Sequence, residues 1–413
     1  MKQVKRTKYI IGLLLLLFSL NGAAQEQLNN YLQQAAENNP GLEARFNEYL
    51  AALQQAPQAK ALPDPQVAFG YFIQPVETRV GPQQFKLSAS QMFPWFGTLK
   101  AKENVAVQQA KAKYEVFQET KASLFNEVRS TYFNLYFNSK AISIIQENQV
   151  VLERFRRMAA IKVEAGMVSA VDQYRLEMEA GDLENELARL KDQQLVLQVQ
   201  FNKLLNVEKT RMIELPDLLW ETDFELSKTA ALDSIRQQNH QLLQLDLQQE
   251  ALRYKGEVAG KSGKPSFNIG IDYTVIGKGE NQLAGTDAFL FPKIGLTIPL
   301  YRNKYKAMVQ QVAYESTANE LQKQNLSNSL ESLFEKTWKD YLDAQRRNAL
   351  YRSQVGLAEN SMHILETEYS SSNRNFEEIL RIDRKLLKYA LELEKAKTDQ
   401  QAAISMIHYL MGK

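Results

Sequence analysis

The side chains that could carry out chemistry are few and scattered along this chain. The three histidines, His240, His363 and His408, stand far apart and lack the spacing of a metal site. Gly277 and Gly279 lie in a polar loop without the strand-to-helix setting of a phosphate cradle. The chain has no cysteine, which excludes disulfides and thiolate sites. We therefore expect no catalytic residues, no metal and no cofactor.

Charged and capping residues do gather at two short breaks between long helical segments. Ser169 is followed by Asp172 three residues later, and Asn375 is followed by Glu378 at the same offset. Each pair is suited to begin a helix, with a capping side chain and an acid at the positive helix end. Arg374 adjoins the second break, and a guanidinium can bridge carboxylates on neighbouring helices. Helix capping alone would also explain both acids.

These breaks are framed by unusually long helices. From Thr98 to about Ala165 the chain contains no Pro or Gly, and such a helix would be roughly 100 Å long. The segment from Lys304 to about Tyr369 is its counterpart, and shorter helices are expected over Ser169–Leu205 and Asn375–Met411. Helices of this length are expected to pack along one another as antiparallel coiled coils. An apolar stripe indicates such packing in the first shorter helix: Leu176, Leu183, Leu187, Leu190, Leu195 and Leu197.

Four segments instead alternate between apolar and polar residues, as strands do. They are Gln66–Ile73, Phe85–Phe93, Phe267–Val275 and Leu290–Ile298. An apolar strand face ordinarily packs on a soluble core, but these helices are polar and the strands have the about nine to eleven residues of a tilted membrane strand. Four strands cannot enclose a lumen, since small closed barrels need about eight. The strands must be pooled between subunits or form a modest soluble sheet.

The sequence also repeats itself. Matches at a spacing of 200 to 206 residues include Asn39 with Asn239, Pro65 with Pro265, Pro94 with Pro299, Arg175 with Arg381, and Leu204 with Leu410. The simplest account is one duplicated unit. We predict a first repeat over 25–206, a connector over 207–229 and a second repeat over 230–413.

Residues 1–24 read as a secretory signal peptide, with four cations before an apolar run and small residues at 22–24. Its removal would change the formal net charge from +2 to −2, so nucleic acid is not an expected partner. Without a cysteine, the mature N-terminus is expected to be non-lipidated.

The doubled order of helix, two strands, long helix, turn and helix resembles the TolC family of outer-membrane efflux factors. The turn from Gly166 through Met167, Val168 and Ser169 to Asp172 is similar to the family's turn at the periplasmic tip. The segment from Tyr369 to Glu378, with Ser372, Asn373 and Asn375, is similar to the equivalent second turn. The junctions at Pro94, Trp95 and Phe96 and at Pro299 and Tyr301 are similar to the family's barrel-to-helix junctions.

The resemblance implies a mainly α fold with a β-barrel portion. Three chains would pool four strands each into a twelve-stranded barrel in outer-membrane lipid, continued as a long α-helical coiled-coil cylinder in the periplasm. It implies a homotrimeric passive exit duct that receives substrate from an inner-membrane efflux pump through a periplasmic adaptor (membrane fusion) protein. The tip turns would contact the adaptor. The segment from Phe93 to Gly97 also resembles members that serve heavy-metal pumps of the resistance-nodulation-division type.

The resemblance further implies a periplasmic gate made by Tyr369, Arg374 and Glu378. The family's second acid, one helical turn beyond Glu378, is replaced by Arg381, which weakens the case for a cation-selective tip.

The competing interpretation of the whole chain is a secreted or periplasmic coiled-coil scaffold or adhesin without a pore. Trp95 and Phe96 suit an interfacial aromatic belt, but they would suit helix packing as well.

Overall fold

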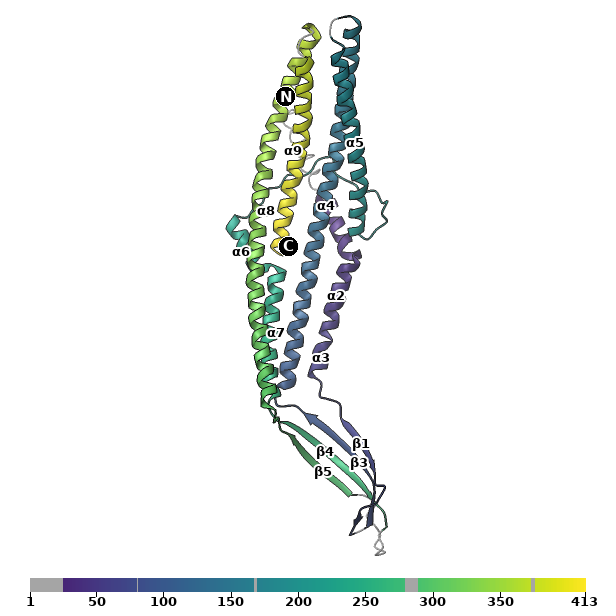
Figure 1. Ribbon diagram of the computed structural model, residues 1–413, viewed down its shortest axis with the longest axis vertical. Helices are drawn as coiled ribbons and strands as arrows, with labels where there is room; N and C mark the ends of the chain where they lie inside the picture. Colours follow the sequence, from purple (N-terminus) through teal and green to yellow (C-terminus); the bar gives the residue numbers. More distant parts are fainter. Residues whose placement is uncertain (1–24, 80, 167–168, 279–288, 373–375) are drawn as a thin grey trace, which may run out of the picture. The chain divides into compact units, whose positions relative to one another are not determined.

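A computed structural model describes residues 25–79, 81–166, 169–278, 289–372 and 376–413 (Figure 1). The predicted signal peptide, 1–24, lies outside these residues. A helix over 25–38 comes first. The elements that follow are α2 (Pro40–Leu53), α3 (Gln55–Lys60), β1 (Gln66–Tyr71), β2 (Glu77–Thr78), β3 (Gly81–Phe93), α4 (Thr98–Glu164), α5 (Val171–Leu204), α6 (Lys228–Gln238), α7 (His240–Ser262), β4 (Ser266–Ile276), β5 (Phe289–Thr297), α8 (Arg302–Ser372) and α9 (Phe376–Leu410).

The chain divides into two compact units, and each draws on both halves of the sequence. The helical unit consists of residues up to 44, 118–239 and 328–413. The sheet unit consists of 45–117 and 240–327, and contains all the strands together with α3, α7 and parts of α2, α4 and α8. The compact units therefore do not coincide with the predicted sequence repeats. Among the described helices, none combines the length and the apolar character needed to cross a membrane.

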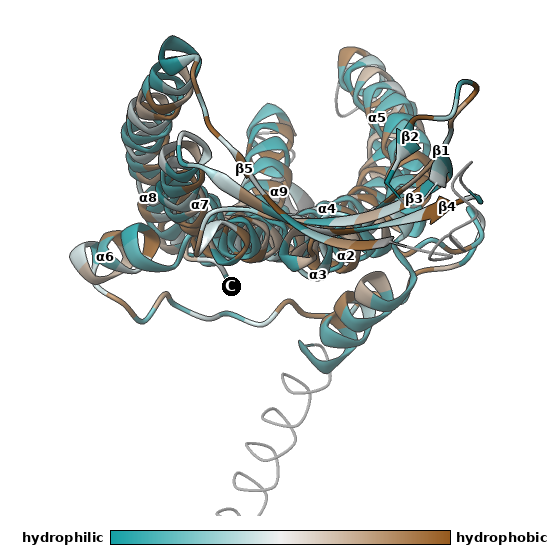
Figure 2. Cartoon of the chain, turned by 90° about the horizontal axis from the view of Figure 1, so that it is seen from below, coloured by the Kyte–Doolittle hydropathy of each residue, from teal (hydrophilic) through white to brown (hydrophobic). Residues whose placement is uncertain are grey.

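The sheet is antiparallel, with strand order β1-β3-β4-β5 and the short β2 paired only with β3. One register row crosses all four long strands: Phe69 lies opposite Leu87, Leu87 opposite Tyr273, and Tyr273 opposite Leu290. Alternation along each strand puts this row and its neighbours on one face, and apolar stretches of the sheet are coloured brown in Figure 2. These four side chains are between 41% and 68% exposed, so the apolar face has no cover within the sheet unit. The predicted alternation is therefore present, without the core that a soluble sheet would have.

The helical unit has its own apolar core, built by the stripes of four helices. α4 contributes Ile145 and Leu152, α5 contributes Leu176, and α8 and α9 contribute Tyr369 and Ile379. The predicted α5 stripe is buried at Leu176, Leu183, Leu187, Leu190 and Leu197. Leu195 is exposed, so its place in that stripe was wrong. With 3.6 residues per turn, a residue five positions after Leu190 and two before Leu197 points to the opposite side of the helix from both.

Two asparagines interrupt the helices that open each half. The amide Nδ2 of Asn39 donates to the backbone carbonyl of Leu204 at 3.2 Å, and Asn239 donates to the carbonyl of Leu410 at 3.0 Å. Asn39 also caps α2, because its Oδ1 accepts from the backbone N–H of Gly41 at 2.9 Å. The sequence pattern predicts a single helix in each place, over Gln27–Gln58 and Leu232–Glu257. Pro40 contributes to the first break, because it has no backbone N–H and disfavours a helical conformation at Asn39. At both breaks the asparagine ties the joint to the end of a helix about 170 residues away in sequence.

The segment between α5 and α6 has no regular structure from 207 to 227, apart from short turns, and packs on the helices. Two tyrosine hydroxyls hold it. The Oη of Tyr136 accepts from the backbone N–H of Leu219 at 3.0 Å, and the Oη of Tyr341 accepts from that of Phe224 at 3.2 Å. Trp220 is buried against Phe133.

Candidate functional site: the helix turns, the groove and the sheet junction

The first turn depends on a glycine in the left-handed backbone region. α4 ends at Glu164, and Gly166 follows with φ of 69° and an N–H that donates to the carbonyl of Val163 at 2.9 Å. This is a common way to end a helix, and glycine adopts it without the steric cost of a side chain. Gly166 therefore fixes where the chain leaves α4.

Ser169 lies two residues before α5 and binds the backbone of the first residue of that helix. Its Oγ accepts from the backbone N–H of Val171 at 3.2 Å. The helix α5 begins at Val171, two residues later than the predicted start at Ser169. Asp172 lies in the first turn, as predicted, where its charge favours the positive helix end. Its carboxylate is 3.4 Å from Arg175. Met167 and Val168 lie outside the described residues.

Tyr369, the first predicted gate residue, is fully buried at the end of α8. The ammonium of Lys162 on α4 lies 3.8 Å from its ring centroid and donates to its backbone carbonyl at 2.6 Å. The ring also contacts Phe376, the first residue of α9, with centroids 5.2 Å apart. Burial raises the pKa of the Tyr369 hydroxyl and lowers the pKa of Lys162. Tyr369 thus joins three helices, which sequence spacing could not reveal.

The rest of the second turn is only partly described. Ser372 is the last residue of α8, and Asn373, Arg374 and Asn375 lie outside the described residues. The bridge expected from Arg374 therefore stays a prediction. Glu378, in the first turn of α9, accepts from Arg381 one turn later on the same helix. Arg381 thus pairs with the carboxylate that was expected to face the constriction.

The same acid-arginine pair begins both α5 and α9. Asp172 with Arg175 and Glu378 with Arg381 have equal spacing within their helices, and each residue of one pair is 206 positions from its counterpart. Arg175 additionally lies 3.5 Å from Glu377, and thereby links α5 to α9. The repeat match of Arg175 with Arg381 was the sequence signal for the equivalent pairs, but it did not reveal the contact of Arg175 with Glu377.

A second link between α5 and α9 lies further from the turns. Nε of Arg384 on α9 is 2.6 Å from Glu179 on α5. Close by, Asp383 is only 2% exposed, and both of its carboxylate oxygens accept from Nδ2 of Asn148 on α4, at 3.0 and 3.1 Å. Burial raises the pKa of the Asp383 carboxyl to about 6. Sequence reasoning missed this pair because its members are 235 residues apart.

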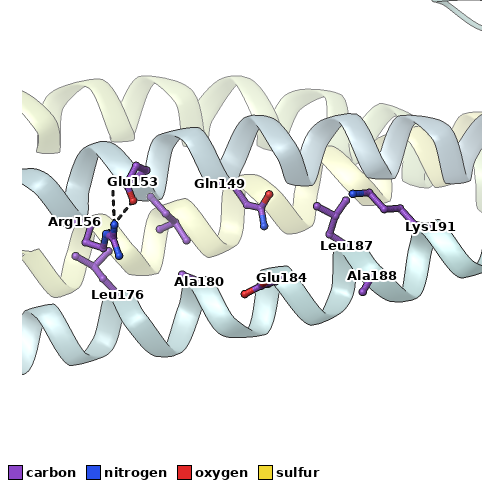
Figure 3. Close-up of a pocket in the computed structure, with 10 residues that line it drawn as sticks. Gln149, Glu153, Arg156, Leu176, Ala180, Glu184, Leu187, Ala188 and Lys191 are labelled. Atoms are coloured by element: carbon purple, nitrogen blue, oxygen red, sulfur yellow. Dashed lines mark hydrogen bonds and ion pairs between the residues drawn. The ribbon is translucent and has the colours of Figure 1, made fainter.

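A groove of about 510 Å³ runs along α4 and α5 (Figure 3). Its lining is mixed: polar and small side chains, namely Gln149, Glu153, Arg156, Ala180, Glu184, Ala188 and Lys191, stand beside the leucines at 152, 176 and 187. Glu153 and Arg156 are paired at 2.9 Å. Charged and small side chains beside leucines make this a surface suited to a neighbouring amphipathic helix.

The sheet junctions expose aromatic side chains. Trp95 stacks on Phe267 with ring centroids 6.1 Å apart, and Phe96 contacts the same ring at 5.8 Å. Phe96 and Tyr301 are largely exposed. Pro94 is half-buried and Pro299 is buried where the strands give way to α4 and α8. Gly97, with φ of 75°, turns the chain into α4. The five predicted junction residues therefore lie together at this end of the strands.

No group of three or more His, Asp or Glu side chains in the described part of the chain is arranged to hold a metal ion.

Residues 31–207 match the family described as outer membrane efflux protein, which is less than half of the chain. Solved structures share the fold over nearly all of it. VceC, from Vibrio cholerae, has a TM-score of 0.77 at 14% identity, covering 94% of this chain and 97% of that one. The outer-membrane channel OprN has a TM-score of 0.79 at 14% identity, covering 94% and 90%. CusC has a TM-score of 0.76 at 14% identity, covering 93% and 92%. No curated protein sequence matches the chain.

Proposed function

We propose that this chain, whose predicted resemblance to the TolC family of outer-membrane efflux factors is confirmed, is the outer-membrane channel of a tripartite efflux system. It would be a passive exit duct, with no catalysis of its own. Three chains would pool their strands into a twelve-stranded barrel, and their helices would continue it into the periplasm.

The observation that carries this proposal is the open, two-sided sheet. β1 and β5 each have one neighbouring strand among the described residues, so each leaves an edge of backbone groups available for pairing. An open edge invites another strand, and in hydrocarbon an edge must be closed. The uncovered apolar face supplies the lipid contact, and the exposed Phe96 and Tyr301 suit the boundary between lipid and water.

The long helices also need a second copy. On the helical-unit part of α8, exposed apolar residues recur every seven or eight positions, at Leu342, Leu350, Leu357 and Ile364. A recurrence near seven keeps them on one side of the helix, as at one position of a heptad. Its partner would be a helix of the adjacent chain in the trimer.

At the turns, we propose that the Lys162 contact with Tyr369 and the α5–α9 ion pairs hold the two helical hairpins of one chain together when the tip is closed. Arg374 would add a bridge to the neighbouring chain. The turns at Gly166 and Ser372, together with the groove between α4 and α5, would receive the adaptor. The inner-membrane pump would set the cargo. The resemblance of the segment from Phe93 to Gly97 supports a heavy-metal pump as the partner.

Cysteine pairing across the subunit boundary tests the proposal, because every cysteine in the experiment is introduced. Ala68→Cys on β1 is combined in turn with a cysteine at Phe291, Gly295 or Thr297 on β5. We expect one combination to give a covalent trimer on oxidation, and the same preparation to conduct ions in planar bilayers.

The matched control combines Ala68→Cys with Asn268→Cys on β4, a strand whose two edges are already paired within its own chain. It should give no covalent trimer. A detergent-free soluble monomer without conductance would contradict the channel and support the scaffold interpretation.

A further inference from the structure

The face of the sheet opposite the apolar one carries three charged side chains from three adjacent strands. Lys86 on β3 and Lys293 on β5 both reach Asp272 on β4, each ammonium lying 2.6 Å from one of its carboxylate oxygens. The Asp272 side chain is 7% exposed, whereas each lysine is 39% exposed. The two cations therefore face the open side of the cluster and cover the anion.

The surrounding sheet accommodates this arrangement. Gly270 lies opposite Lys293 in the register, and a Cβ added there would stand 2.7 Å from the Cε of Lys293 and 2.9 Å from the carbonyl oxygen of Ala89. A side chain there would clash with the backbone of Ala89 and displace the end of Lys293, so glycine suits this position beside the cluster. Ser88, opposite Asp272 on β3, adds a hydrogen bond to the carboxylate.

The cluster is not electrically neutral. Two lysines and one aspartate leave a charge of +1 on each chain. The other charged residue in the described strands is Glu77, on the short β2 outside the main strand order. The central part of the polar face is therefore positive.

We propose that Lys86, Asp272 and Lys293 determine the ion preference of the barrel section of the channel and favour the passage of anionic solutes. This inference rests on the proposed function, in which the polar face lines the lumen. Three copies form a ring with a net charge of +3. Rings of lysine or arginine favour anions in pores, and low-dielectric walls strengthen their field.

The ion pairing alone would be explained by cross-strand stabilisation, which is common in antiparallel sheets. Stabilisation needs no excess charge, however, and one lysine would suffice for it. The second lysine both covers the same carboxylate and makes the cluster positive.

The test measures reversal potentials of the full-length trimer in planar bilayers under a potassium chloride gradient near 0.1 M, where the screening length is about 10 Å. Lys86→Gln and Lys293→Gln each make the cluster neutral, and should shift the reversal potential toward cation preference. Asp272→Asn raises the charge to +2 per chain, and should shift it the opposite way. The tip is unchanged in all variants, so its contribution cancels.

The double variant K86Q/D272N separates charge from pairing, because it breaks the cluster and keeps one lysine and a charge of +1. We expect it to have the wild-type reversal potential, and we expect all shifts to shrink at 1 M salt, where the screening length is about 3 Å. Conducting single variants whose reversal potentials all equal the wild-type value would overturn the inference. A wild-type chain that does not conduct would instead overturn the proposed function.

Discussion

At the scale of single residues, Asp383 is a buried carboxyl whose ionisation conflicts with its surroundings. It is buried, and its described hydrogen-bond donor is the neutral amide of Asn148. The charged groups that face it are Glu179 on α5, Glu366 on α8 and Arg384 on its own helix. The Oδ1 of Asn148 is buried without a hydrogen-bond partner in the described structure. A protonated carboxyl could donate to that oxygen, whereas a carboxylate cannot.

This environment predicts a pH-dependent stability with a definite sign. Because burial raises the pKa from 3.8 to about 6, the folded chain holds this proton more tightly than the unfolded chain does. The favourable contribution is therefore lost as pH rises from about 4 to about 6, and amounts to about 3 kcal/mol. Asp383→Asn keeps the shape and can donate to Asn148. We expect it to raise the thermal midpoint above wild type at pH 8 and to leave it nearly unchanged at pH 4.

Asp182→Asn is the control, since Asp182 is an exposed carboxylate on α5. Its effect should stay within about 0.5 kcal/mol at both pH values. An Asp383→Asn midpoint that differs from wild type equally at pH 4 and pH 8 would show that the carboxyl does not titrate in this range.

Residue-scale contacts were also the least predictable from the sequence. The acid at Asp172 and the glycine at 166 are local signals, so sequence reasoning found them. The N-cap expected at Ser169 was wrong by one residue, because Ala170 occupies that position without a side-chain cap. The contacts of Lys162 with Tyr369 and of Asn148 with Asp383 join residues more than 200 positions apart. Nothing in the local pattern distinguishes these lysine and asparagine residues from others on a polar helix.

At the scale of the elements, the hydrogen bonds of Asn39 and Asn239, here called the asparagine joints, connect the first helices of each half to its last helix. Asn39 binds the end of α5 and Asn239 the end of α9, and their partners Leu204 and Leu410 match in the repeat. A buried amide tied to a terminal carbonyl satisfies a helix end that would otherwise lack a partner. The joint is therefore structural in both halves.

Removing the buried joint should destabilise the helical unit. Asn239→Ala leaves the carbonyl of Leu410 without its side-chain donor in a buried place, which costs about 1–3 kcal/mol. We expect a lower thermal midpoint of the trimer, with secondary structure retained by circular dichroism. Gln237→Ala, two residues earlier and exposed, is the matched control and should change the midpoint little. If Asn239→Ala and Gln237→Ala changed the thermal midpoint equally, the hydrogen bond of Asn239 to Leu410 would have no structural role.

The long elements were predictable because their patterns are long. Alternation located the four main strands, and the ends of α4, α5, α8 and α9 fall within three residues of expectation. The pairing order of the strands and the two-residue β2 were not predictable. Both depend on which strands meet in space, and β2 is too short to show a period. The break at Asn239 was invisible for the same reason, whereas Pro40 marks the break at Asn39 in the sequence.

At the scale of the whole molecule, the apolar face of the sheet predicts how the chain responds to a misplaced charge. Ile294 on this face is 84% exposed. Ile294→Lys would place an ammonium in the lipid, at a cost of about 2–4 kcal/mol near the bilayer midplane. We expect less heat-modifiable trimer in outer-membrane fractions and more aggregated chain.

Asn268→Lys puts the same side chain on the opposite, polar face of β4. It should assemble at close to the wild-type level. If both lysine variants assemble equally well, or fail equally, the two faces do not differ in their surroundings and the barrel arrangement is wrong.

The two open edges of the sheet also govern the kinetics of assembly. In the part of a single chain that the structure describes, β1 and β5 each have one edge without a neighbouring strand. A linear dimer would present the same two edges, because joining one pair uses up one of each and leaves one of each. In the proposed trimer, the third chain closes the ring and removes both remaining edges at once. A dimer gains one interface for two chains and a closed trimer gains three for three, so ring closure favours the trimer and leaves open edges only on incomplete assemblies.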